Sequence, residues 1–331
     1  MKEALFYDKS ENNVVFCKLC NHLCKIKNGK TGICNVRKNI DGKLFSLIYN
    51  KIAAKNIDPV EKKPLYHFLP GSYTYSISTV GCNLKCKHCQ NYEISQSKDI
   101  FGYEISSEEN IKTVLNNKLP SISYTYTEPT IYYETARDIG MLAMKHNVKN
   151  IFVSNGYMSK SVIDDMKNWV HGINIDLKSF SDDFYKKVCG ASLKPVLENI
   201  VKLKEAGVWM EITTLVIPRY NDSDKELMDI AKFIVSVDKG IPWHVSAFYP
   251  TYLLTDTHPT SLDTIVNARL IGISEGLKYV YTGNVRDDSG SNTYCPKCNE
   301  LLIERRGYTV KVSNLTEGVC NNCGEKIEGV F

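Results

Sequence analysis

Twelve cysteines constrain this 331-residue chain more than any other feature, because they fall into separate groups. Closely spaced cysteines in a cytoplasmic chain indicate metal sites rather than disulfides. We therefore predict a catalytic domain over residues 66–285, flanked by four-cysteine metal-binding modules over residues 1–65 and 286–331. In order, the groups are Cys17, Cys20, Cys24 and Cys34; Cys82, Cys86 and Cys89; Cys189; and Cys295, Cys298, Cys320 and Cys323.

The composition is that of an ordinary soluble globular protein, with 43% hydrophobic and 24% charged residues. No run approaches the roughly 20 apolar residues of a membrane span. The N-terminal residues MKEALFYDKS lack the apolar core of a signal peptide. We therefore expect a cytoplasmic protein with no membrane partner.

The central triplet, Cys82-x3-Cys86-x2-Cys89, follows an apolar segment that reads as a strand. Three thiolates can hold three irons of a [4Fe–4S] cluster. Because cluster iron normally takes four cysteines, a three-cysteine site leaves one iron open to a small molecule. The alternative is a zinc site whose fourth ligand lies far away in the sequence.

Segments typical of strands and helices alternate through the middle of the chain, which predicts a parallel α/β sheet. Such sheets carry their functional residues at the carboxyl ends of the strands. The six βα units are too few for a complete eight-stranded barrel. The expected strands are 74–80, 121–127, 150–156, 173–178, 209–217, 243–249 and 278–283, and the expected helices 106–119, 130–146, 159–169, 195–206, 224–236 and 262–275.

The spacing of the triplet resembles that of radical S-adenosylmethionine (SAM) enzymes. The segments Asp58–His67, Gly81–Gln96 and Tyr124–Pro129 look like the AmmeMemoRadiSam-system radical SAM family, which is similar to pyruvate formate-lyase activating enzymes. The resemblance implies a partial (β/α)6 barrel in which SAM binds the open iron of a [4Fe–4S] cluster. An electron from a flavodoxin- or ferredoxin-like donor then cleaves SAM to methionine and a 5′-deoxyadenosyl radical.

The resemblance also implies which residues contact SAM. His88 would contact the adenine, Glu128 the amino group, and Asn155, Asp176 and Lys178 the ribose and carboxylate. Simpler roles are open to four of these residues. His88 would then be a surface histidine, Glu128 a carboxylate at the first turn of a helix, and Asp176 and Lys178 a structural ion pair.

Two positions depart from the family pattern. Tyr126 and Thr127 stand where many members have two glycines, so the backbone there is less free. Val153 stands where the activating enzymes carry an acidic residue, which puts their cation site in doubt.

The two end modules have different cysteine spacings. We assign tetrathiolate zinc to the N-terminal group, with an auxiliary iron–sulfur cluster as the alternative. The C-terminal C-x2-C-x21-C-x2-C pattern, with a strand at 309–312, predicts a zinc ribbon or rubredoxin-like fold that holds zinc or iron. The isolated Cys189 is either a buried apolar residue or a hydrogen-atom donor at the catalytic mouth.

The net charge of +4 is concentrated in residues 1–65, which carry 13 basic and 6 acidic residues. This basic region suits an acidic electron donor, a nucleic acid or an acidic protein substrate, and the simpler alternative, which we favour, is a set of solvated surface lysines. The C-terminal module is slightly acidic, so we do not expect a nucleic-acid partner. We predict an oxygen-sensitive radical SAM oxidoreductase that abstracts hydrogen from a protein or small molecule, with a glycyl radical enzyme as one candidate protein substrate. The alternatives are an RNA-modifying radical SAM enzyme and a non-catalytic metal-binding scaffold.

Overall fold

The computed structural model describes the backbone of residues 1–331 and every side chain except that of Asp288. Its largest element is an eight-stranded sheet with the order β16-β15-β14-β13-β12-β11-β9-β8. Seven strands are parallel, and β8 pairs antiparallel with β9. The strands are β8 (Ala54–Pro59), β9 (Tyr73–Ser78), β11 (Ser121–Tyr124), β12 (Lys149–Ser154), β13 (Gly172–Asp176), β14 (Trp209–Val216), β15 (Trp243–Ala247) and β16 (Val280–Gly283).

The predicted parallel α/β sheet is confirmed, since all seven expected strands overlap a parallel strand of the structure. The eighth strand, β8, was not predicted. It is an edge strand in which Lys55, Asn56 and Ile57 are exposed, so it lacks the apolar run that identifies a buried parallel strand. It also precedes the predicted boundary at residue 65, so the central sheet begins earlier in the chain than that boundary.

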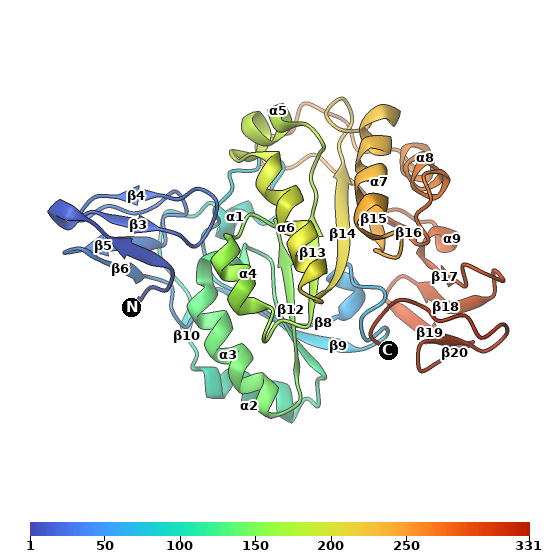
Figure 1. Ribbon diagram of the computed structural model, residues 1–331, viewed down its shortest axis with the longest axis horizontal. Helices are drawn as coiled ribbons and strands as arrows, with labels where there is room; N and C mark the ends of the chain where they lie inside the picture. The colour runs from blue at the N-terminus through green and yellow to red at the C-terminus, as the bar shows by residue number, and fades with distance from the viewer.

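Six helices connect the parallel strands, and Figure 1 shows them ranged along one face of the sheet. Ser106 caps α2 and forms the expected capping box with Glu109. Ser223 and Ser261 are the N-cap residues of α7 and α8, and each side chain accepts a hydrogen bond from a backbone N–H in the first turn of its helix. Within the described residues, every helix is too short or too polar to cross a bilayer. The helices are α2 (Ser107–Asn116), α3 (Tyr133–Lys145), α4 (Lys160–Met166), α6 (Leu193–Glu205), α7 (Asp224–Asp238) and α8 (Leu262–Ser274).

The N-terminal module, blue in Figure 1, consists of two small antiparallel sheets. Arg37 joins this module to the sheet domain through a buried, two-pronged ion pair with Glu134 at the start of α3, at 2.6 and 3.0 Å. The sheets contain β1 (Lys2–Glu3), β5 (Arg37–Ile40) and β6 (Lys43–Ser46), and β2 (Tyr7–Lys9), β3 (Val15–Cys17) and β4 (Lys25–Ile26).

The C-terminal module lies at the opposite end of the molecule (Figure 1) and has the short antiparallel strands of the predicted ribbon. His67 anchors it, because Nδ1 lies 2.6 Å from the Glu328 carbonyl oxygen and Nε2 lies 2.6 Å from the Tyr281 hydroxyl. The expected strand at 309–312 is confirmed as β19. The strands are β17 (Thr293–Tyr294), β18 (Leu301–Arg306), β19 (Thr309–Val312), β20 (Leu315–Thr316) and β21 (Val319–Cys320).

Candidate metal centre and active site

The cysteine triplet lies on a loop, residues 81–89, that leaves the carboxyl end of β9; we call it the triplet loop. It begins at Gly81, whose φ of +93° favours glycine. A Cβ atom at this position would lie 2.6 Å from Cγ1 of Val36 and 3.1 Å from the carbonyl oxygen of Cys34. The triplet loop can therefore pack closely on the N-terminal module only because residue 81 has no side chain.

A single turn of π-helix, η4 (Tyr185–Cys189), holds the other side of the triplet loop. The backbone N–H groups of Lys85 and Lys87 donate to the carbonyl oxygens of Cys189 and Val188, at 2.8 and 3.0 Å. Turns of π-helix are frequently found at functional sites. The arrangement brings Cys189, which stands alone in the sequence, next to the central triplet.

The thiols of the triplet are largely buried and lie among hydrogen-bonding groups. The backbone N–H of Leu84 donates to Sγ of Cys82 at 3.4 Å, and Sγ of Cys89 lies 3.1 Å from the hydroxyl of Ser95. Burial raises the pKa of Cys82 well above its ordinary value, and the Glu128 carboxylate raises it further. A bound cation would reverse this shift, because metal ligation keeps thiols deprotonated.

Cys86 has a different environment from Cys82. A hydrogen bond from the Cys189 thiol lowers the pKa of Cys86, and the Lys178 ammonium group lowers it too, although burial opposes them. The ligand atoms of Cys86, His88 and Cys189 all lie within 4.8 Å of one another. These three residues are therefore a second possible ligand set beside the predicted triplet.

Glu128 is buried at the end of the segment that follows β11. Its Oε1 accepts hydrogen bonds from the Ser154 hydroxyl at 2.8 Å and from the backbone and hydroxyl of Thr130, and its Oε2 accepts one from the Asn155 backbone at 2.8 Å. Burial raises the pKa of Glu128 although these hydrogen bonds oppose the shift. The predicted helix-start role is confirmed, since Glu128 caps the short helix η3 (Pro129–Tyr132). Oε2 keeps one lone pair for a further donor.

Asn155 connects this carboxylate to the triplet loop. Its side-chain amide donates to Oδ1 of Asn83 at 2.8 Å and lies 4.0 Å from Sγ of Cys82. The strand ends of β11 and β12 thus meet the loop from β9, as the parallel topology requires.

His88 is buried rather than on the surface, with 5% of its area exposed. Burial, helped by the Lys178 ammonium group, lowers its pKa to about 3, so the imidazole is neutral at pH 7. Its Nδ1 has no hydrogen-bond partner in the protein. A buried ring nitrogen without a partner is free to accept or donate to a ligand.

Asp176 and Lys178 follow β13 and form an ion pair, with Nζ 2.9 Å from Oδ2. The predicted structural pairing is therefore present. Burial disfavours the Lys178 cation, but Asp176 and the Cys86 thiolate outweigh it and raise the pKa of Lys178 well above its ordinary value. Lys178 is a fixed positive charge between Asp176 and the triplet loop.

The backbone at Tyr126 has a conformation that glycine adopts more readily than other residues. Its φ is +61°, in the left-handed region that a residue with a side chain rarely adopts. Its hydroxyl donates to Asp58, and the ammonium group of Lys63 lies 4.6 Å from the ring centre. These contacts hold the tyrosine in a strained conformation.

A family model described as the radical SAM superfamily matches residues 76–231. An uncharacterised protein of Methanocaldococcus jannaschii is 44% identical over 336 residues, which span 100% of both chains. This chain belongs to the radical SAM superfamily. The pyruvate formate-lyase 1-activating enzyme of Escherichia coli strain K12 is a more distant radical SAM relative, 23% identical over 46% of this chain and 65% of its own.

Solved structures show the same fold. SuiB of Streptococcus suis, determined with S-adenosylmethionine, matches 69% of this chain and 53% of its own with a TM-score of 0.52 and 14% identity. A radical SAM methyltransferase from Sphaerobacter thermophilus matches 71% of each chain with a TM-score of 0.51 and 16% identity. At these identities the likeness concerns the radical SAM fold alone.

Radical SAM membership implies a [4Fe–4S] cluster and SAM, and the triplet loop fits such a cluster. Its three thiols are gathered on one short loop, a backbone N–H already points to the Cys82 sulfur, and Lys178 supplies positive charge. Hydrogen bonds to cluster sulfurs and nearby charge are the features by which proteins adjust iron–sulfur centres.

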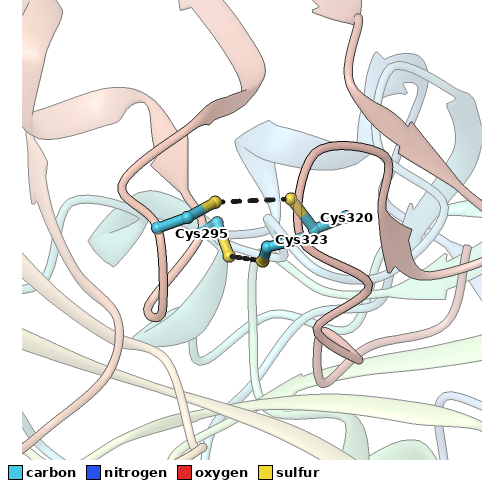
Figure 2. Close-up of side chains that lie close together, drawn as sticks. Cys295, Cys320 and Cys323 are labelled. Atoms are coloured by element: carbon cyan, nitrogen blue, oxygen red, sulfur yellow. Dashed lines mark hydrogen bonds between the residues drawn. The ribbon is translucent and has the colours of Figure 1, made fainter.

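The C-terminal cysteines of this radical SAM protein are arranged to hold a single metal ion. The sulfur atoms of all four lie within 4.8 Å of one another, with Cys295 3.6 Å from Cys323 and Cys298 3.7 Å from Cys320. Figure 2 shows the Cys295, Cys320 and Cys323 side chains pointing toward one another. Tetrahedral zinc with Zn–S bonds of about 2.3 Å separates its sulfurs by about 3.8 Å, which agrees with these distances.

The N-terminal cysteines lie together as well, but around a cavity. Cys17, Cys20, Cys24 and Cys34 line it, with Asn83 of the triplet loop. The predicted grouping of these four cysteines is therefore seen in the structure, while the bound metal is not determined by the grouping alone.

A second cavity, of about 540 Å³, was not predicted. Its lining combines the segment after β8, the ends of β15 and β16, and the C-terminal module, and includes Glu61, Tyr66, His244, Arg286, Arg305 and Tyr308. Its volume is that of a small-molecule site. No sequence motif signals it, because these residues are spread over more than 200 positions, from Glu61 to Tyr308, and meet only when the C-terminal module packs on the sheet.

Proposed function

We propose that this protein reductively cleaves SAM and uses the resulting 5′-deoxyadenosyl radical to abstract a hydrogen atom from a protein or small-molecule substrate. The observation that supports this most directly is the triplet loop, which presents Cys82, Cys86 and Cys89 at the carboxyl edge of a parallel sheet. When bound there, a [4Fe–4S] cluster supplies the electron for the cleavage and one iron for the amino and carboxylate groups of SAM.

The surrounding residues would bind and orient SAM. The free lone pair on Oε2 of Glu128 would accept a hydrogen bond from the amino group, and Asn155 would face the ribose from the end of β12. Lys178 would neutralise the carboxylate as a point charge, with Asp176 fixing its position. The neutral ring of His88 would lie against the adenine, its free Nδ1 available for a hydrogen bond.

The partners follow from the same chemistry. The excess of basic residues in positions 1–65 favours an acidic, low-potential donor of the flavodoxin or ferredoxin type. The 540 Å³ cavity would admit a substrate side chain or a small molecule. The similarity to an activating enzyme that acts on pyruvate formate-lyase favours a glycyl radical enzyme as the protein substrate.

Anaerobic reconstitution with iron, sulfide, SAM and dithionite tests the proposal. The wild type should form 5′-deoxyadenosine, whereas Cys82→Ala and Cys89→Ala should not. The matched control is Cys189→Ala, which removes a neighbouring thiol outside the proposed triplet and should still form 5′-deoxyadenosine. Loss of the iron and sulfide of one cluster from Cys189→Ala, with no such loss from Cys82→Ala, would assign the Cys86–His88–Cys189 set instead and contradict the proposal.

A deuterium-transfer experiment would identify the substrate class. Deuterated cell extract is incubated with the reconstituted enzyme, and the fraction that transfers deuterium to 5′-deoxyadenosine is isolated. Transfer from RNA would favour an RNA-modifying enzyme, and a protein that makes no 5′-deoxyadenosine under any condition would be a metal-binding scaffold.

A further inference from the structure

The two four-cysteine sites of this chain differ in how far apart their sulfur atoms lie. In the C-terminal site all four lie within 4.8 Å of one another. Among the described cysteines, the N-terminal group contains no set of three that meets this limit, although all four line one cavity. The distances between the sulfur atoms therefore distinguish the N-terminal four-cysteine site from the C-terminal one.

This difference indicates different occupants. One tetrahedral ion draws four thiolates to about 3.8 Å from one another. In an iron–sulfur cluster the four thiolates are distributed over two or more iron atoms, so thiolates bound to different irons lie farther apart. The central triplet, whose family holds a [4Fe–4S] cluster, also lies outside the 4.8 Å limit as a set of three in the part of the chain described. The N-terminal site resembles the cluster site, not the single-ion site.

A second observation points to an anionic group with acceptor atoms in the N-terminal cavity. Asn83 lines the cavity and is 1% exposed, and its side chain lies beside the Cys20 thiol, but its Nδ2 has no partner within hydrogen-bond distance in the protein. Its Oδ1 is already used, because the Asn155 amide donates to it at 2.8 Å. A buried N–H donor without an acceptor is costly unless a ligand supplies one.

Arg37 provides another buried donor on the same cavity. It is 1% exposed, and its Nε has no hydrogen-bond partner. It lines the cavity together with the four cysteines, so its positive charge lies next to their sulfur atoms. Two unpaired donors beside four thiols suit a group that carries sulfide acceptors as well as metal.

We propose that Cys17, Cys20, Cys24 and Cys34 hold an iron–sulfur cluster rather than a single zinc ion, with the Asn83 amide donating a hydrogen bond to it. The four thiolates complete the iron coordination, so this second cluster has no open position for SAM. The inference is independent of the proposed function, because it concerns a site that stays intact when the central triplet is removed.

The N-terminal site lies against the edge of the sheet that carries the triplet loop. Cys20 pairs with Met158, just after β12, and Nε2 of His22 lies 2.8 Å from the carbonyl oxygen of Asn83. Asn83 follows Cys82 in the chain. One asparagine therefore contacts both cysteine sites, and removing its amide should change the properties of the N-terminal cluster.

The first test is made on the full-length chain with Cys82→Ala, Cys86→Ala and Cys89→Ala, reconstituted anaerobically with iron and sulfide. We expect about two to four irons with equal sulfide per chain, an electron paramagnetic resonance signal on reduction, and one zinc from the C-terminal site. Adding Cys17→Ala and Cys34→Ala should remove the iron and sulfide while that zinc remains. Two zinc ions per chain without sulfide would overturn the proposal.

A second measurement keeps the proposal testable if the triplet variant does not fold. The intact chain should then contain more iron and sulfide than one [4Fe–4S] cluster accounts for. Four irons together with two zinc ions would overturn the proposal in this form of the protein as well.

The role of Asn83 has its own readout. In the triplet variant, Asn83→Leu should shift the reduction potential of the remaining cluster to a more negative value, because a hydrogen bond to sulfur stabilises the reduced form. The control is Asn267→Leu, on the exposed side of α8, which should leave the potential unchanged. An unchanged potential in both variants would overturn the assigned hydrogen bond.

Discussion

Replacing Gly81 by alanine tests whether the N-terminal module shapes the triplet loop. The new Cβ would lie 2.6 Å from Cγ1 of Val36 and 3.1 Å from both the carbonyl oxygen of Cys34 and Cδ1 of Ile131. Val36 is buried and β-branched, so it has little freedom to rotate away. The carbonyl oxygen belongs to the backbone and cannot move without shifting the N-terminal cysteine site.

Two effects contribute to the expected loss of stability. Holding alanine at a φ of +93° costs about 1–2 kcal/mol. Overpacking a filled interior costs about 1–3 kcal/mol more. Gly276→Ala is the matched control, because Gly276 has a φ of +104° but a Cβ there would meet no atom within 4 Å. The control therefore carries the backbone cost alone.

Urea unfolding of both variants under anaerobic conditions measures the difference. We expect Gly81→Ala to lose about 1–3 kcal/mol more free energy of unfolding than Gly276→Ala. Because residue 81 precedes Cys82, Gly81→Ala should also retain less iron at the triplet, while Gly276→Ala retains the wild-type amount. Equal unfolding free energies and equal iron contents would show that the contact with the N-terminal module does not shape the loop.

Three further predictions concern other parts of the molecule. Burial lowers the pKa of His67 to about 4, so as the pH falls this histidine is protonated in the unfolded chain before it is protonated in the folded one. The free energy of unfolding should therefore fall by about 2 kcal/mol between pH 7 and pH 5. Urea titrations of His67→Phe should show a correspondingly flatter pH dependence. Lys178→Met should weaken SAM binding at least tenfold by calorimetry, since a charge-assisted hydrogen bond is worth about 1.5–3 kcal/mol; unchanged affinity would remove Lys178 from the SAM site. Cys298→Ser should lower the zinc content by one ion per chain in elemental analysis and leave iron unchanged, and an equal loss of iron would contradict the single-ion assignment.

The sequence was sufficient for those parts of the fold that depend on local pattern. The seven parallel strands are largely buried and consist of apolar, aromatic and small hydroxyl residues typical of strands, whereas the edge strand β8 has three exposed residues in succession. The capping box at Ser106 and Glu109 was also readable, because it depends on residues three positions apart. Cysteine spacing likewise identified all three groups.

What could not be predicted depends on contacts between distant segments. Cys189 lies beside Cys86 because a π-helical turn pairs with the triplet loop, and no spacing rule encodes that pairing. Sequence spacing gave both four-cysteine groups as closed coordination sets, but the separation of their sulfurs depends on how the surrounding loops pack. Tyr126 was judged a departure from the family pattern, and only the structure shows that its φ lies in the left-handed region.

The triplet loop is clasped from two directions, by Val36 and His22 of the N-terminal module and by the carbonyl oxygens of η4. None of these contacts involves a cysteine sulfur, so the loop owes its shape to the polypeptide before any inorganic component arrives. The inorganic cofactor would then bind to a loop that is already folded. Damage by air should accordingly strip the inorganic core and leave a folded apoprotein that can be loaded again.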